Sequence, residues 1–159
     1  MTETDGTFLV THADAESAVL RDVDSGQVHT LGADDDLDLA AGDVLEATLT
    51  PSPPLEVQME VTRVRARRRV TVEESEEPPT TQERTIAAEQ SVGELTRRER
   101  AGDGELHVLT VPSEETTAAV EDVLDDEETL ARAARMPTVS RVEVRSDAEA
   151  GVVSVRYLP

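Results

Sequence analysis

Apolar and polar residues alternate along much of the first 72 residues, and this period of two predicts β-strands. Short strands are expected at residues 7–10, 18–23, 27–31 and 44–49, and a long one at residues 55–72. The turn Asp24-Ser25-Gly26 predicts a hairpin between the second strand and the third. Several short strands and one long bent strand are typical of a small β-barrel of the OB or SH3 kind.

The long strand carries a change of phase. Its apolar residues occupy odd positions as far as Val61 and even positions from Val64 onward. A strict period of two cannot change phase without an extra residue. We therefore expect a β-bulge or a break near Thr62-Arg63.

A central helix is predicted from Thr80 to Gly102. Thr80 and Glu83 have the spacing of a capping box, and the prolines at 78–79 keep a strand from running into the helix. Gly102 and Gly104 supply the left-handed backbone that closes a helix. One face of this helix would carry three apolar residues, namely Ala88, Val92 and Leu95.

The rest of the chain mixes helix and strand. A strand is expected at residues 106–111, and a helix capped by Ser113 follows it. The inward side of this helix would carry Ala119, Val120, Val123 and Leu124. Another helix should start at Asp125 or Asp126 and end at Pro137, and a hairpin should pair residues 139–144 with 152–157.

The patterns predict an α+β protein in two parts. Residues 1–77 would form the small β-barrel domain and end in a charged linker, Glu73 to Pro79. Residues 78–159 would form a helical linker and a small α/β segment, which together make an α+β domain.

The charge of the chain changes this picture. Asp and Glu number 35 against 15 basic residues, all arginine, and the formal net charge is −20. Such an excess is found in disordered chains, but 37% apolar residues in periodic runs favour a folded one. We interpret the composition as adaptation to molar salt, which screens repulsion between carboxylates. Arginine, more weakly hydrated than lysine, suits that solvent.

Composition also limits the chemistry and the location. The chain has no cysteine, so disulfides and thiolate sites are excluded. The acidic start lacks the apolar segment of a secretion signal, and no apolar run approaches the roughly 20 residues that span a bilayer. We expect a soluble, cytoplasmic protein without membrane contact.

An arginine row is the sharpest candidate site. Arg63, Arg65, Arg67 and Arg69 would point to one face of an extended strand, where four guanidinium groups could bind a phosphate backbone. The aromatic residues that stack on bases are missing, because Phe8 and Tyr157 are the only two in the chain. The alternative is that the row pairs internally with acidic residues, namely Asp34, Asp35, Asp36, Asp38 and those between Glu73 and Glu77.

Two further arginine groups have simpler interpretations. Arg97, Arg98 and Arg100 would complement the dipole at the C-terminal end of the predicted helix. On its outer side, Glu94 and Arg98 would form an i,i+4 pair. The third group lies in the terminal hairpin and should face solvent, namely Arg141, Arg145 and Arg156.

Metal and catalytic sites have little support. His12 and Asp14 could join His29 around a metal if their strands are neighbours, but ordinary surface histidines are the simpler interpretation. The acidic stretch from Asp34 to Asp38 lacks the EF-hand spacing. No nucleophile elbow, phosphate loop or dinucleotide fingerprint is present. We expect no cofactor and no metal, and we rank an enzyme last among the functions.

Three stretches resemble a known family. They are Gly6-Thr7-Phe8-Leu9-Val10-Thr11-His12-Ala13-Asp14, then Ser91-Val92-Gly93-Glu94-Leu95-Thr96-Arg97-Arg98-Glu99-Arg100-Ala101-Gly102, and the ending Val153-Ser154-Val155-Arg156-Tyr157-Leu158-Pro159. Together they resemble an uncharacterised family of halophilic archaea, a domain of unknown function, over the whole chain. The resemblance implies a cytoplasmic archaeal protein and supplies no catalytic residues.

We expect a non-enzymatic binding or adaptor module, with a protein as its partner. The alternative is a nucleic-acid-binding module that uses the Arg63–Arg69 strand face. An exposed apolar patch would favour a protein partner, and an exposed arginine row beside a groove would favour nucleic acid. A deep pocket with convergent polar groups would favour an enzyme.

Overall fold

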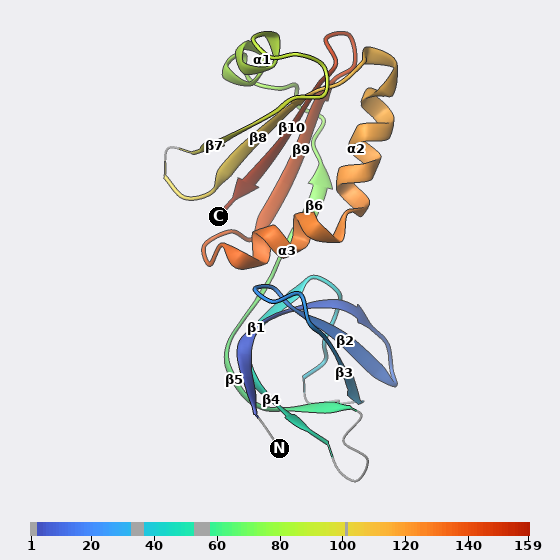
Figure 1. Cartoon of the computed structure of the whole chain (residues 1–159), viewed down its shortest axis with the longest axis vertical. Helices are drawn as coiled ribbons and strands as arrows, with labels where there is room; N and C mark the ends of the chain where they lie inside the picture. Colours follow the sequence, from blue (N-terminus) through green and yellow to red (C-terminus); the bar gives the residue numbers. More distant parts are fainter. Residues whose placement is uncertain (1–2, 33–36, 53–57, 101) are drawn as a thin grey trace. The chain divides into compact units, whose positions relative to one another are not determined.

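The computed structural model describes residues 3–32, 37–52, 58–100 and 102–159. The chain divides into two compact units (Figure 1). The first consists of Met1–Val70 and Leu130–Arg135, and the second of Thr71–Thr129 and Met136–Pro159. The chain as described contains both helices and strands, with two sheets, and this confirms the predicted α+β class.

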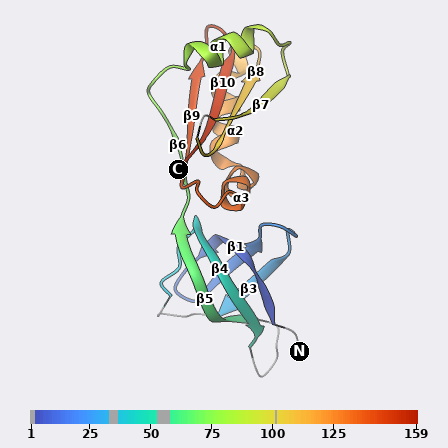
Figure 2. The same ribbon diagram turned by 90° about the vertical axis from the view of Figure 1, so that its left-hand side faces the viewer.

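Five strands of the first unit close into a ring in the order β1-β2-β3-β5-β4 (Figure 2). Neighbouring strands are antiparallel except β3 and β5, which are parallel. The predicted hairpin is confirmed by the pairing of β2 with β3. The strands are β1 (Thr4–Ala13), β2 (Ser17–Asp22), β3 (Val28–Gly32), β4 (Asp43–Pro51) and β5 (Met59–Arg69).

Alternate residues of these strands fill the centre of the ring with aliphatic side chains around one aromatic ring. The buried set is Phe8, Val10, Ala18, Leu20, Leu31, Leu45, Ala47 and Leu49. Strand β5 reaches this core at Val61, which packs against it.

The predicted bulge is confirmed. Val61 lies opposite Leu49 and Arg63 opposite Thr48, so Thr62 is an extra residue in β5. A second shift, which the phase of the apolar residues did not predict, makes Arg65 extra as well. Each extra residue increases the local twist and redirects the side chains that follow.

The second unit contains a five-stranded sheet in the order β6-β9-β10-β8-β7. Strands β6 and β9 are parallel, and all other neighbours are antiparallel. The pairing of β9 with β10 confirms the predicted terminal hairpin. The strands are β6 (Thr71–Glu74), β7 (Leu95–Glu99), β8 (Glu105–Thr110), β9 (Arg141–Asp147) and β10 (Val152–Leu158).

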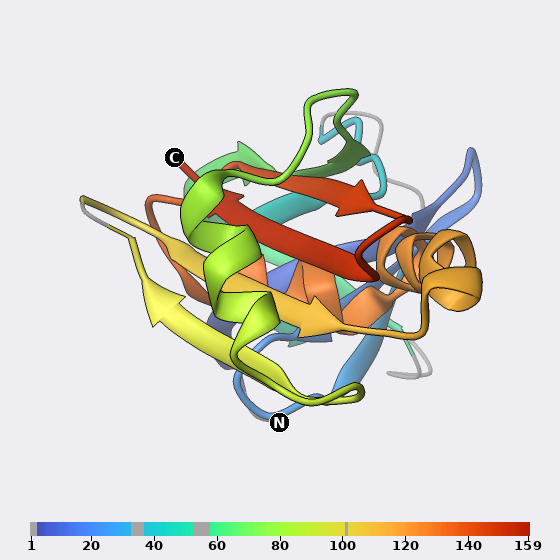
Figure 3. The same cartoon turned by 90° about the horizontal axis from the view of Figure 1, so that it is seen from above.

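Helices cover both faces of this sheet. Helix α1 (Thr81–Ala88) buries Ile86 and Ala87 against Leu106, Val108 and Val152 (Figure 3, green helix). Helix α2 (Thr116–Asp125) packs on the other face, because it meets Val153, and adjacent residues of a strand point to opposite faces.

The predicted inward side of α2 is confirmed. Val120 is buried, and the other three residues pack half-buried around the same cluster, namely Ala119, Val123 and Leu124. A short 3-10 turn, η1 (Ser113–Glu115), precedes α2, so the prediction that Ser113 caps the helix is wrong. The cap position is Glu115, whose side chain makes no capping hydrogen bond. Helix α3 (Glu127–Arg135) begins after Asp126, as predicted.

The long helix predicted from Thr80 to Gly102 is wrong beyond Ala88. Its start is confirmed, because Thr80 and Glu83 form the capping box. The chain then turns through Gly93, whose φ is +90°, and enters strand β7. The Gln90 amide stabilises this turn by donating to the carbonyl oxygens of Glu94 and Val108 at 3.1 and 3.0 Å. Side-chain hydrogen bonds of this kind offer the backbone an alternative to the helix.

Consequently the apolar face expected on the helix does not exist. Val92 and Leu95 are 61% and 46% exposed. Gly102 and Gly104 keep the predicted left-handed backbone, with φ of +100° and +105°, but they turn β7 into β8. A Cβ atom on Gly104 would lie 2.0 Å from the Tyr157 carbonyl oxygen, so this position requires glycine.

The charged linker predicted at Glu73 to Pro79 is also wrong at its start. Residues Thr71–Glu74 form β6, which pairs with β9. Val72 explains why, since it packs half-buried against the cluster under α2. The long strand predicted to reach Val72 therefore corresponds, in its described part, to two strands in different sheets, β5 and β6.

Candidate functional site

The structure divides the four predicted site arginines between two faces. Residues directly opposite in an antiparallel pair point to the same side. Arg67 lies opposite the core residue Leu45 and shares its side of the sheet. Arg63 lies opposite Thr48, which points to the other side of β4 from Leu45. The bulge at Arg65 separates the two. The assumption of one continuous face was wrong because a strict period of two does not hold across a bulge.

Arg67 and Arg69 share one carboxylate, that of Asp43. The Nη2 atom of Arg67 donates to Oδ2 at 2.8 Å, and the Nε atom of Arg69 donates to Oδ1 at 3.0 Å. Only 3% of the Asp43 side chain is exposed. Arg67 also donates to the backbone carbonyl oxygens of Leu37 and Asp38. These contacts hold the loop before β4 against strand β5.

Arg65 also has partners within the chain. Arg65 donates to Thr48 Oγ1 at 2.9 Å and to the Ala47 carbonyl oxygen at 3.0 Å, and lies 3.5 Å from Asp5. Arg63 is exposed and has no hydrogen-bond or ion-pair partner among the described residues. The described carboxylate partners of the row are Asp5 and Asp43, and neither was among the acids predicted to pair with it. Of those, Asp34, Asp35 and Asp36 lie outside the described residues.

The pKa of Asp43 is lowered. Burial alone would raise the pKa of this carboxyl group, but hydrogen bonds from the Ala40 backbone N–H and from Arg69 and Arg67 outweigh it. The carboxylate is therefore stabilised in its charged form, and it pairs with two members of the predicted row.

A second set of charges was missed by sequence reasoning. Glu83 is 2% exposed. Its Oε1 accepts hydrogen bonds from the Thr80 N–H and the Ser154 hydroxyl, both at 3.0 Å. Its Oε2 lies 3.6 Å from Arg156 Nε. The capping box predicted the hydrogen bond from the Thr80 N–H. No local sequence pattern shows which strand residue will lie above a helix cap.

Arg156 extends this network to Glu143. Its Nη1 donates to Glu143 Oε1 at 3.2 Å, and Arg145 Nε donates to the same atom at 2.5 Å. Burial would raise the pKa of Glu143, but the hydrogen bond from Arg145 and the charges of neighbouring arginines lower it. The prediction that these arginines face solvent is wrong for Arg145 and Arg156, whose side chains are 12% and 19% exposed, while Arg141 is exposed as predicted.

The predicted histidine and carboxylate set does not come together. His12 contacts its neighbour Thr11, and Asp14 accepts hydrogen bonds from the Glu16 and Ser17 N–H groups. His29 is buried, edge-on to Phe8 with 5.7 Å between ring centroids. Within the described ranges no group of three or more His, Cys, Asp or Glu side chains could hold a metal ion.

Strand β7 presents an open edge. It is the last strand of the second sheet. Thr110 N–H donates to the Glu94 carbonyl, and Arg100 N–H donates to the Gly104 carbonyl, so these residues face β8. By the alternation of antiparallel ladders, Leu95, Arg97 and Glu99 direct their N–H and C=O groups away from the sheet. Such an edge can accept another strand.

Arginines predicted at a helix end lie on this strand instead. Arg97 and Arg98 belong to β7 and Arg100 follows it directly. The expected complement to a helix dipole and the i,i+4 pair of Glu94 with Arg98 are therefore both wrong. The segment Leu95–Arg100 carries three arginines and one glutamate in a chain of net charge −20.

Comparison with known proteins adds one finding. A model of a family of unknown function, DUF5812, matches residues 4–146. The chain belongs to this family. The match includes the arginines of β5 and β7 and ends before β10, so the last of the three resembling stretches lies outside it. No curated protein and no solved structure matches the chain.

None of the helices in the described part of the chain combines the length and the apolar character needed to cross a bilayer.

We predict that Asp43→Asn destabilises the ring by about 1.5–3 kcal/mol at neutral pH, because two charge-assisted hydrogen bonds are weakened. The pKa of Asp43 is lowered in the folded state, so its contribution is present above the unfolded pKa of about 4 and is lost as pH falls below it. The difference in stability between the variant and the wild type should therefore shrink in acid.

Urea unfolding at a series of pH values measures this difference. The matched control is Asp24→Asn, at an exposed turn residue, which should leave stability nearly unchanged. A variant as stable as the wild type at pH 7 would contradict the assigned role of Asp43.

Proposed function

We propose that this chain is a non-enzymatic binding module that takes an extended, acidic segment of a partner protein along the outer edge of β7. The observation that supports it is the open edge itself, where Leu95 is 46% exposed and the nearby Val92 is 61% exposed. Exposed large apolar residues at an unpaired edge are costly in a protein that binds nothing there.

The backbone of β7 suits strand addition. The outward N–H and C=O groups of Leu95, Arg97 and Glu99 would bond to the added strand, as in other cases of β-augmentation. The side chains of the added strand would alternate between the two faces of the sheet. One set would lie beside Leu95 and Arg97, and the other beside Thr96 and Arg98.

Charge selects the kind of segment. Arg97, Arg98 and Arg100 outnumber the single glutamate of this edge, whereas the chain as a whole is strongly acidic. A basic partner would be attracted to most of the surface and repelled here. An acidic partner would be repelled elsewhere and guided to β7, so the edge gives specificity through complementary charge.

Nucleic-acid binding by the first unit is the second candidate. The order β1-β2-β3-β5-β4 with parallel β3 and β5 supports a barrel of the OB kind, a fold that binds single strands. A cavity of about 710 Å³ is lined by Glu3, Asp5, Thr48, Thr62, Arg63 and Arg65. The acidic residues in this lining, and the pairing of Arg65, Arg67 and Arg69, favour the β7 proposal instead.

The acidic composition also bears on the solvent in which the protein works. We infer that the protein works in the cytoplasm of a halophilic archaeon, where molar salt screens its carboxylates. The support is the excess of acids over bases and the use of arginine alone as the base.

We predict that β7 binds a labelled peptide alternating Glu and Val more tightly than one alternating Arg and Val. Arg97→Pro should weaken this binding by about tenfold or more, because it removes one outward N–H and one charge. The control Arg97→Gln removes only the charge and should cost less. Fluorescence anisotropy over a salt series measures the affinity of the wild type and of both variants for each peptide.

Equal losses in the two variants, or equal affinity for both peptides, would contradict strand addition at β7. A labelled single-stranded oligonucleotide forms the second arm of the experiment. Retention that is lost in Arg63→Gln and kept in Arg97→Pro would support the nucleic-acid candidate in its place.

We also predict that the melting temperature rises steeply from dilute buffer to molar KCl, because screening relieves repulsion among 35 acidic side chains. Circular dichroism follows the melt. Sucrose is the control, since it favours burial without screening charge, and it should stabilise less. A full cooperative melt at the same temperature in dilute buffer would contradict halophilic adaptation.

A further inference from the structure

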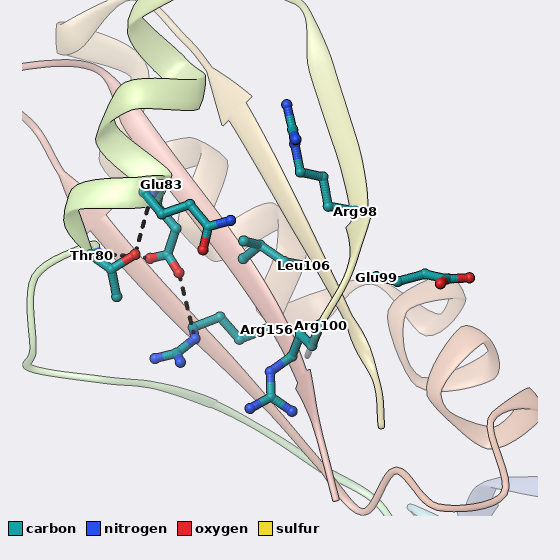
Figure 4. Close-up of a pocket in the computed structure, with 8 residues that line it drawn as sticks. Thr80, Glu83, Arg98, Glu99, Arg100, Leu106 and Arg156 are labelled. Atoms are coloured by element: carbon teal, nitrogen blue, oxygen red, sulfur yellow. Dashed lines mark hydrogen bonds and ion pairs between the residues drawn. The ribbon is translucent and has the colours of Figure 1, made fainter. Parts of the chain in front are cut away.

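Two opposite charges at the β7 edge lie symmetrically about Thr96. Glu94 precedes Thr96 and Arg98 follows it by the same interval, so the three side chains share one face of the strand. Thr96 lies opposite Val108, which packs against α1, so this face is the one that α1 covers. Figure 4 shows that Arg98 and its neighbour Glu99 leave β7 in different directions, as this alternation requires.

Neither charge is paired within the described part of the chain. Glu94 and Arg98 are both exposed, and their side chains have no hydrogen-bond or ion-pair partner there. Four residues of an extended strand span about 13 Å, so the two cannot pair with each other. The Arg98 guanidinium also points away from Glu83 and Arg156 (Figure 4). Both charges are therefore available to a partner.

A second copy of β7, paired antiparallel with the first, would satisfy both charges at once. When two identical strands pair about a two-fold axis at Thr96, Glu94 of each copy lies opposite Arg98 of the other, because these residues flank the axis at equal distances. Opposite charges at directly facing positions stabilise a sheet. The segment from Glu94 to Arg98 is thus complementary to itself.

The backbone of the edge fits the same register. Leu95 and Arg97 direct their N–H and C=O groups away from the sheet, and pairing about Thr96 places Leu95 of one copy opposite Arg97 of the other. Residues placed in this way exchange both of their hydrogen bonds. The aliphatic stem of Arg97 would then cover Leu95, which is 46% exposed. At Thr96 the two backbones approach most closely, and an uncharged side chain suits that position.

Other registers are less favourable. A two-fold axis at Arg97 or at Arg98 places two copies of the same guanidinium group opposite each other, and like charges at facing positions destabilise a sheet. An axis at Leu95 places Glu94 opposite Thr96 and leaves the carboxylate unpaired. Charge therefore selects the register about Thr96.

We propose that two copies of this chain pair through β7 about Thr96, so that their second sheets join into one continuous sheet. The proposal names a second occupant of the edge on which the proposed function rests, and the two occupants exclude each other. Strand β7 lies at the opposite edge of the sheet from β6, the strand by which the chain enters this unit. Two short edge strands bury less area than a standard interface, so the dimer is weak and yields to a tighter partner.

Salt acts in opposite directions on the two occupants. Each chain carries a formal net charge of −20, so two copies repel each other in dilute buffer. Molar salt screens this repulsion beyond about 3 Å, whereas the direct contacts between the strands persist. Attraction of an acidic peptide to the arginines of the edge is weakened by salt. The dimer fraction should therefore rise with KCl, while peptide affinity falls.

Sedimentation equilibrium of the whole protein tests the proposal, over the KCl range in which circular dichroism shows it folded. We expect a monomer–dimer equilibrium whose dimer fraction increases with KCl. Glu94→Arg and Arg98→Glu should each raise the dimer dissociation constant by about tenfold or more, because each places like charges across the interface. An equimolar mixture of the two variants should form heterodimers as tightly as the wild type forms dimers, because opposite charges then face each other again.

The matched control is Glu121→Arg, which makes the same change of charge at an exposed residue of α2 and should dimerise as the wild type does. In the wild type, the amides of Leu95 and Arg97 should exchange more slowly at higher protein concentration, and this tests the interface even if a variant unfolds. A wild type that stays monomeric, unchanged dissociation constants in both folded variants, or no heterodimers in their mixture would overturn the proposal.

The two proposals for this edge fail separately. Monomeric Glu94→Arg keeps the outward backbone groups and gains positive charge, so it should bind the peptide alternating Glu and Val at least as tightly as the wild type does. Peptide binding without dimers would overturn self-pairing and leave the proposed function standing. Dimers without peptide binding would do the reverse.

Discussion

The buried carboxylate of Glu83 is the interaction on which the second unit depends. It joins helix α1 to strand β10, because its partners are the N-terminal cap of α1 at Thr80 and two residues of β10, the hydroxyl of Ser154 and the guanidinium of Arg156. Breaking a buried charge pair by removing one partner costs about 3–5 kcal/mol. The helix start and the strand must therefore keep one relative position, in which Thr80, Glu83 and Arg156 line a cavity of the second unit.

The same chemistry recurs in the first unit. Asp43 is buried and satisfied by two arginines of β5, as Glu143 is satisfied by two arginines of the second sheet. A planar guanidinium group can serve two acceptors, which suits a chain whose only basic side chain is arginine. Most described arginines near these carboxylates therefore have a structural role. The arginines without a described carboxylate partner, on β7 and directly after it, are the ones available to bind a partner.

Local patterns predicted much of the fold. The capping box at Thr80, the bulge at Thr62, the inward side of α2 and the terminal hairpin all follow from spacing within a few residues. The helix beyond Ala88 was mispredicted because its end depends on Gln90 reaching a distant strand. Nothing in the local sequence shows that contact. The position of Val72 likewise depends on which sheet the chain joins, and alternation alone does not identify the sheet.

The arrangement of the arginine row was mispredicted for a related reason. The arginine row was read as one face, but the bulge at Arg65 and the pairing with Asp43 are both properties of the assembled ring. The arginines of β7 were assigned to a helix, so their place on an open edge could not be predicted. The sequence predicts the local role of Glu83 in the capping box, but not its long-range contacts with Ser154 and Arg156.

The most direct test of this account is hydrogen exchange in Glu83→Gln, with the exposed residue change Glu89→Gln as control. The substitution keeps the shape of the side chain and removes the charge that faces Arg156. The account predicts that the amides of α1 and of β10 near Ser154 lose protection, while the control keeps wild-type protection. Unchanged protection of α1 in Glu83→Gln would contradict it.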